Sequence, residues 1–268
     1  MSRELRVLPV EGMPEVREGD RLGELIAERA VLQDGDVVVI SQKVVSKAEG
    51  RVVRLGSVSP SQRARELAER LGKEAALVEL VLSESREVLR SERVLVTETH
   101  HGFVCANAGI DSSNLPEDGT VCLLPEDPDA SARQIRAELA PTVEGPGMGV
   151  AGPSPPLPAD PHPRPLPAVV ISDSFGRAWR LGQAEVAIGC AGLQPLDDWR
   201  GRKDASGREL SATVIAIADE VAAAADLVRE KDTGAPAVVV RGLGRYVGAE
   251  DGPGAAALRR LPGEDLFR

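Results

Sequence analysis

The sequence contains few aromatic residues and few cysteines, and it lacks long apolar runs. Phe, Trp and Tyr make up 2% of the chain, and its three cysteines, Cys105, Cys122 and Cys190, lie far apart in apolar stretches. An odd number of separated cysteines fits neither a disulfide framework nor a zinc site, so we expect buried free thiols. No apolar run approaches the roughly 20 residues of a membrane helix, and no targeting segment opens the chain, so we expect a cytoplasmic protein without membrane contact.

Basic residues are also scarce relative to acidic ones. Lys and Arg number 32 against 42 Asp and Glu, so the net charge is −10, and no basic tract exceeds Arg200 to Lys203. This balance argues against nucleic acid as a partner. An anionic ligand would have to be bound by local cations, backbone amides or divalent metals. The nucleotide signatures GxxxxGK(S/T) and strand-linked GxGxxG are missing as well, so any nucleotide site must be built differently.

Strands and helices are predicted in an irregular order. Apolar, β-branched or alternating stretches predict strands near 5–8, 37–40, 94–97, 103–106, 121–124, 168–172, 210–217 and 237–240. Helical spacing of apolar residues predicts helices that begin at the N-cap Asp20 and at Ser59-Pro60, and others over about 74–82, 131–139 and from Asp219. Because no regular βαβ period appears, we predict an α+β fold with mixed sheets, packed helices and two closely associated subdomains, and no Rossmann or P-loop unit.

One segment departs from this pattern. Residues 141–167 contain ten of the chain's twenty prolines and four of its glycines, with little that could pack or pair. We interpret the segment as a flexible or polyproline-II-like surface insertion between residues 1–140 and 168–268.

Two polar segments follow apolar strands and have the residue types of a binding site. The stretch 105–114 contains Asp111, Asn114 and further amide and hydroxyl side chains. It is either a functional loop or an Asx-turn in which Asp111 or Asn114 caps local backbone amides. In the stretch 171–177, Asp173 and Ser174 offer the hard oxygen ligands of a divalent ion, since Mg²⁺ takes one or two carboxylates and fills its octahedron with water and phosphate. The alternative for Asp173 is a plain helix N-cap.

A third segment, 41–51, is polar and cationic directly after the strand ending at Ile40. Lys43 and Lys47 are four residues apart. In a helix they would share a face, and in a strand their even separation would also place them on one side. They could meet phosphates there, and the alternative is a pair of solvated surface lysines.

Together and in this order, the segments resemble the coenzyme F-420-0:L-glutamate ligase family. Eight blocks carry the resemblance, and they cover nearly the whole chain outside residues 141–167. The blocks are Gly12-Met13-Pro14-Glu15-Val16 with Gly19-Asp20, 42–51, 102–114, 173–183, Asp197-Asp198-Trp199-Arg200-Gly201, Gly207-Arg208-Glu209-Leu210, Ala218-Asp219-Glu220 and Val240-Arg241-Gly242. The resemblance implies that 1–140 and 168–268 form one catalytic unit.

The resemblance also implies roles for individual positions. Asp111 and Asp173 would hold one divalent metal, and Ser174, where some relatives have Thr, would bind a second. The match across 229–235 is loose, so a further ligand there stays open, and no residue is assigned to catalysis or to the incoming glutamate. The positions matching nucleotide-binding residues are Met13, Pro14, Glu15, Val16, Ser41, Gln42, Lys47 and Asn114.

The activity implied by the resemblance is the GTP-dependent, GDP-forming addition of L-glutamate to F-420-0, a phosphorylated deazaflavin, in coenzyme F-420 biosynthesis. Further γ-linked glutamates and an acyl-phosphate intermediate belong to this expectation. So do a homodimer, two divalent ions per site, Mg²⁺ or Mn²⁺, and a monovalent cation such as K⁺. Phosphoryl transfer depends on positioning and charge neutralisation, so the lack of a His and carboxylate pair is no objection. The alternatives are a glutamyl ligase for a folate or other pterin-like acid, and a non-catalytic GTP-binding regulator.

Overall fold

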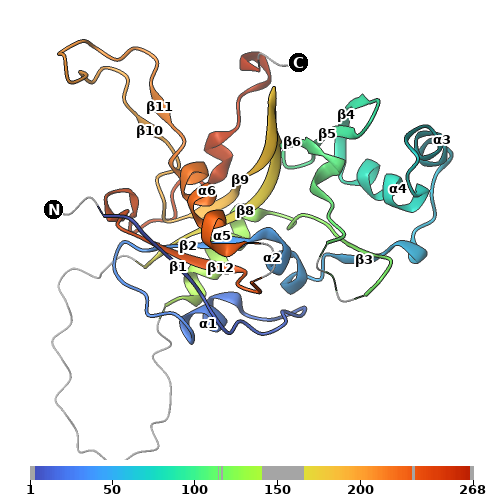
Figure 1. The fold of residues 1–268 in the computed structure, drawn as a ribbon, viewed down its shortest axis with the longest axis horizontal. Coiled ribbons are helices and arrows are strands. Elements are labelled where there is room, and N and C mark those ends of the chain that lie inside the picture. Colours follow the sequence, from blue (N-terminus) through green and yellow to red (C-terminus); the bar gives the residue numbers. More distant parts are fainter. Residues whose placement is uncertain (1–3, 114, 116, 141–165, 231–232, 266–268) are drawn as a thin grey trace, which may run out of the picture.

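The centre of the protein is a five-stranded mixed sheet. The computed structural model describes residues 4–113, 115, 117–140, 166–230 and 233–265. The strands follow the order β1-β12-β2-β8-β9 (Figure 1), and only β2 and β8 are parallel neighbours in this sheet. Their bounds are β1 Arg6–Pro9, β12 Ala237–Arg241, β2 Val37–Ser41, β8 Ala168–Arg177 and β9 Arg180–Ala191.

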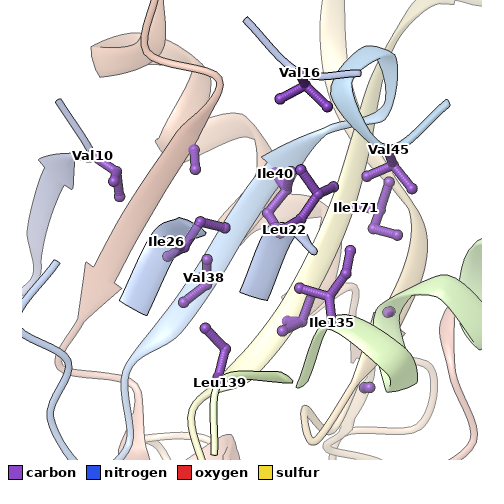
Figure 2. Close-up of a cluster of buried hydrophobic side chains, with 14 of the residues drawn as sticks. Val10, Val16, Leu22, Ile26, Val38, Ile40, Val45, Ile135, Leu139 and Ile171 are labelled. Carbon is purple, nitrogen blue, oxygen red and sulfur yellow. The ribbon is translucent and has the colours of Figure 1, made fainter. Parts of the chain in front are cut away.

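Helices cover both faces of this sheet, which confirms the predicted α+β class. On one face lie α1 (Leu22–Ala27) and α5 (Pro128–Glu138), whose apolar side chains pack on Val38 and Ile40 (Figure 2). On the other face α6 (Ile217–Arg229) packs on Val37 and Val39. Because β2 is buried on both sides, its sequence is a continuous apolar run rather than an alternation. No helix in the described part of the chain is long and apolar enough to span a membrane.

A smaller subdomain has its own apolar core. Helices α3 (Gln62–Leu71) and α4 (Ala75–Ser83) pack beside a sheet of β4 (Ser85–Ser91), β5 (Leu95–Thr99) and β6 (Val104–Ala106). Its centre is a cluster of buried residues, Ala64, Ala68, Val78, Val81, Leu95 and Ala108. The strand pair β3 (Val52–Arg54) and β7 (Thr120–Cys122) and the helix α2 (Gln42–Ala48) lie between the two cores (Figure 1).

Some predicted boundaries were wrong. The N-cap of α1 is Arg21, because the Asp20 carboxylate instead accepts a hydrogen bond from the backbone N–H of Arg17. The predicted strand over 210–217 shrinks to β11 (Val214–Ile215), which pairs with β10 (Asp197–Asp198) in an arm that projects from the molecule (Figure 1).

The hairpin of β8 and β9 is the largest element that the sequence did not predict. Strand β8 continues five residues beyond the predicted end at residue 172, and β9 pairs with it along its whole length. β9 contains two glycines and three alanines, which have weak strand propensity, so pairing with β8 decides its conformation. Of the predicted insertion 141–167, residues 141–165 lie outside the described residues.

The three cysteines are free and buried, as predicted. Burial raises the pKa of Cys105 and Cys190 to about 12 and that of Cys122 to about 11. These thiols therefore stay protonated near neutral pH and act as small apolar side chains.

Gly189 should tolerate no side chain, because β9 approaches the first turn of α5 closely there. A Cβ atom at Gly189 would lie 2.2 Å from the backbone oxygen of Pro128. We expect Gly189→Ala to lower the free energy of unfolding by about 1–3 kcal/mol or more, as overpacking does. Urea unfolding followed by circular dichroism measures this. Gly56→Ala, whose Cβ would meet nothing within 4 Å, is the control, and equal stability of both variants would contradict the prediction.

Candidate functional site

A cavity of about 780 Å³ opens at one edge of the main sheet. Because β2 and β8 are parallel, their carboxyl ends meet at this edge. Strand β12 is antiparallel to β2, so β12 begins at the same edge. Ligands of open α/β sheets bind in such places, outside the carboxyl ends of the strands. The smaller subdomain closes the other side through residues 105–113.

All but one of the predicted site residues line this cavity. Asn114 lies outside the described residues, so its placement stays a prediction. The loop before α1, the end of β2 with α2, the loop after β6 and strand β8 each contribute. The predicted residues found in the lining are Met13, Pro14, Glu15, Val16, Ser41, Gln42, Lys47, Asp111, Asp173 and Ser174.

Lys43 and Lys47 lie on one face of α2, and both point to the cavity. The side chain of Lys43 is 14% exposed and that of Lys47 is 11% exposed, so they are not solvated surface lysines. Lys43 Nζ lies 2.8 Å from Asp111 Oδ2 and donates to Ser113 Oγ at 2.8 Å. Lys47 Nζ lies 2.7 Å from Glu15 Oε1. Each lysine thus joins α2 to a different wall of the cavity.

Asp111 accepts a hydrogen bond from a local backbone amide and also lines the cavity. Its Oδ1 accepts a hydrogen bond from the backbone N–H of Ser113 at 2.7 Å, and its carboxylate also faces the cavity. Burial acts to raise the pKa of Asp111, but Lys43 and Ser113 outweigh it and hold the pKa below its ordinary value. Asp111 is therefore an anion at neutral pH.

Asp173 is not a helix N-cap, because it lies inside β8 opposite Val186. Asp173 and Cys105 of β6 line the same cavity, and after burial the charge of Asp173 is the second cause that raises the pKa of Cys105. Ser174, the next residue, points to the other face of the strand, as the alternation of β-strands requires.

A buried ion pair behind Ser174 was missed by the sequence analysis. Glu185 and Arg229 are 4% and 6% exposed, and Arg229 Nη2 lies 2.6 Å from Glu185 Oε2. The hydroxyls of Ser172 and Ser174 both donate to Glu185, and Arg229 Nη1 donates to Ser172 Oγ at 3.2 Å. Burial acts to raise the pKa of Glu185, but Arg229 and the two serines lower it overall.

This arrangement orients the Ser174 hydroxyl. Ser174 gives its hydrogen to Glu185, which fixes the position of its oxygen at the cavity wall. The sequence signals for the pair were an acid inside an apolar strand and an arginine in the last turn of a helix. Neither could be matched to the other before the pairing of β8 with β9 was known.

Among the described residues, the cavity lining contains more acids than bases. Three cations, Lys43, Lys47 and Arg229, stand against five carboxylates, Glu15, Asp111, Asp173, Glu185 and Glu230. Each of these three cations lies 2.6–2.8 Å from a carboxylate oxygen.

The donors fit a divalent ion that arrives with phosphate. Asp111, Asp173 and Ser174 supply two carboxylates and one hydroxyl on facing walls, and Mg²⁺ commonly takes its remaining ligands from water and phosphate. Within the described residues, no group of three or more His, Cys, Asp or Glu could hold a metal ion by itself. The described residues therefore offer part of a coordination shell rather than a complete cage.

Comparison with known proteins gives one consistent result. A family model described as F420-0:Gamma-glutamyl ligase matches residues 12–146 and 165–242. The coenzyme F420:L-glutamate ligase of Methanopyrus kandleri is 44% identical over 267 residues, which cover 98% of both chains. The proteins of that name from Archaeoglobus fulgidus and Methanothermobacter thermautotrophicus are 45% and 43% identical. They align with 89% and 98% of this chain and over 88% and 99% of their own lengths.

Breaking the Glu185 and Arg229 pair should destabilise the protein. Arg229→Met leaves a buried carboxylate without its cation, which typically costs about 3–5 kcal/mol. We expect the double variant Glu185→Gln with Arg229→Met to recover much of this loss, because no charge then remains buried. Urea unfolding of both variants measures the difference.

The control is Arg200→Met, which removes an exposed ion pair with Asp198 and should leave the urea midpoint unchanged. A double variant no more stable than Arg229→Met would show that the arginine acts by packing and not by charge.

Proposed function

This chain belongs to the F420-0:gamma-glutamyl ligase family, and from this membership we propose that it joins L-glutamate to coenzyme F420-0. The observation that carries the proposal is the length of the match. The Methanopyrus kandleri ligase aligns over 98% of both chains, so the relationship extends to the whole protein and not to one shared domain. The product would be a glutamylated deazaflavin in coenzyme F420 biosynthesis, and further γ-linked glutamates would follow by the same reaction.

We propose that GTP activates the acceptor. A carboxylate is a poor electrophile, so its oxygen would first attack the γ-phosphorus of GTP and release GDP. The glutamate amine would then attack the carbonyl carbon of the acyl phosphate, form the amide and release phosphate. Both steps depend on holding the reactants in line and on stabilising phosphate charge, rather than on a strong general base.

The cavity lining offers contacts for the nucleotide. The loop 13–16, the end of β2 at Ser41 and Gln42, and Lys47 lie together on one side of the cavity. Lys47 is held by the exposed Glu15, whose carboxylate would turn to solvent when a phosphate takes its place. Asn114 completes the nucleotide contacts in this proposal.

The excess of carboxylates among the described lining residues supports a divalent metal. Asp111 and Asp173 would hold one ion, and the Ser174 oxygen, which lines the same cavity, would bind a second. Mg²⁺ or Mn²⁺, when bound, would supply the positive charge that the phosphates need. A monovalent cation such as K⁺ and a homodimeric assembly complete the proposal.

Direct assay tests the function. Purified protein with F420-0, L-glutamate, GTP and Mg²⁺ or Mn²⁺ in K⁺ buffer should yield glutamylated product and GDP in equal amounts, measured by liquid chromatography and mass spectrometry. Parallel reactions replace GTP by ATP and F420-0 by a folate. No product with either metal would refute the proposal. Turnover of the folate alone would show that the acceptor is a pterin-like acid. GTP binding without turnover of either acceptor would indicate a regulator.

Removing a proposed metal ligand should weaken metal binding without unfolding the protein. Loss of an outer-shell partner costs about 10–100-fold in metal affinity. We therefore expect at least this loss for Asp173→Asn, and also for Asp111→Asn. Mn²⁺ binding in the presence of GTP is measured by electron paramagnetic resonance, and circular dichroism checks the fold.

Asp118→Asn is the matched control, because Asp118 is exposed and outside the cavity lining. Wild-type Mn²⁺ affinity in Asp173→Asn would remove that residue from the metal site.

A further inference from the structure

Aromatic side chains are scarce in this chain but gather at the cavity. The sequence has three phenylalanines, and two of them, Phe103 and Phe175, touch. Their ring centroids are 6.1 Å apart, and the ring planes meet at 78°. Among the described residues that line the cavity, Phe175 is the one aromatic side chain. Within the described lining, stacking on an aromatic ring is therefore possible at Phe175 alone.

Phe175 lies next to the site where phosphate chemistry is proposed. It follows Asp173 by two residues in β8, so both side chains lie on the same face of the strand, about 7 Å apart along its axis. The residues proposed for the nucleotide are on α2 and on the loop before α1. A molecule whose carboxylate reaches Asp173 from the hairpin side would therefore pass over Phe175.

The ring of Phe175 is supported from behind. Phe103 and Phe175 meet in an edge-to-face arrangement, and His101 stacks on Phe103 with 5.7 Å between ring centroids. His101 is held in turn, because its Nε2 lies 2.9 Å from the backbone oxygen of Pro125. The guanidinium of Arg259 lies 5.7 Å from the centroid of Phe103. A ring held by such neighbours loses little conformational freedom when a ligand stacks on it.

The direct neighbours of Phe175 in the hairpin point to the other face of the sheet. Gly176 follows Phe175, and Gln183 lies opposite Gly176 in β9, so strand alternation turns both away from the face of Phe175. On its own face, the ring of Phe175 is the flat apolar surface of the described lining, and a flat aromatic ring is the ligand that suits such a surface.

We propose that Phe175, supported by Phe103, binds the planar ring system of the acceptor. The proposal rests on the proposed function, in which the acceptor is a deazaflavin. It makes the β8 and β9 hairpin the part of the site that selects the acceptor by its ring. The acid end of the acceptor lies toward Asp173 and Asp111, and the ring lies toward the hairpin tip.

Binding of F420-0 without GTP or metal tests this assignment. Equilibrium dialysis followed by the absorbance of the deazaflavin gives Kd for the full chain. Stacking of a base on an aromatic side chain is typically worth enough that alanine substitution weakens binding about tenfold or more. We expect this loss for Phe175→Ala, a smaller loss for Phe175→Leu, and none for Trp179→Ala. Trp179 lies in the same hairpin, is 84% exposed and does not line the cavity.

A second ligand separates ring recognition from general damage. The ring-free ribityl phospholactate portion of F420-0 should bind wild type and Phe175→Ala equally, and so should GTP. If the alanine variant does not fold, Phe175→Leu is compared with wild type in the same two binding measurements.

Equal affinity of wild type and Phe175→Ala for F420-0, in a protein that glutamylates it, would overturn the ring assignment alone. Equal weakening of F420-0 and the ring-free ligand would also overturn it. A wild-type protein that binds no F420-0 would overturn the proposed function as well.

Discussion

The parallel pairing of β2 with β8 is the constraint on which the site depends. Five residue pairs, from Val37 with Ala168 to Ser41 with Ser172, set the register between two strands more than 120 residues apart in the chain. This register brings the end of β2 beside Asp173. The backbone N–H of Ser41 also donates to the oxygen of Pro236 at 2.9 Å, so the start of β12 reaches the same edge. A slip of one residue would turn every one of these side chains to the opposite face.

The cavity walls come from two cores and are joined by ion pairs. Lys43 with Asp111 connects α2 to the smaller subdomain, Lys47 with Glu15 connects α2 to the loop before α1, and Arg229 with Glu185 connects α6 to β9. These three pairs differ in burial. Glu15 and Asp111 remain partly exposed and can exchange partners with a ligand, whereas Glu185 is buried and holds its serines and its arginine in one arrangement. The site thus combines an adaptable side with a rigid one.

The loop that delivers Asp111 has an unusual backbone. Asn107, Ala108 and Gly109 are three consecutive residues with positive φ, at 51°, 54° and 71°. Non-glycine residues adopt this region at a cost, so the surrounding packing must favour it. Ala108 is buried in the core of the smaller subdomain, and Lys73 donates to the side chain of Asn107 at 3.0 Å. The tight turn directs the chain from β6 into the cavity wall.

The sequence by itself determined the fold class and most strands of the main sheet, and it predicted ten residues that the structure places in the cavity lining. The strand β2 could be predicted because it is a continuous apolar run, and polar residues that follow it directly marked the site. The other site residues were assigned from the family blocks. For residues 41–51 it left helix and strand open, since both place Lys43 and Lys47 on one side. Tertiary structure decided that this segment is a helix, formed the strand β9, and determined where Glu185, Arg229 and Phe175 lie. Strand pairing selects which distant side chains meet, and spacing along one segment contains no information about its partner.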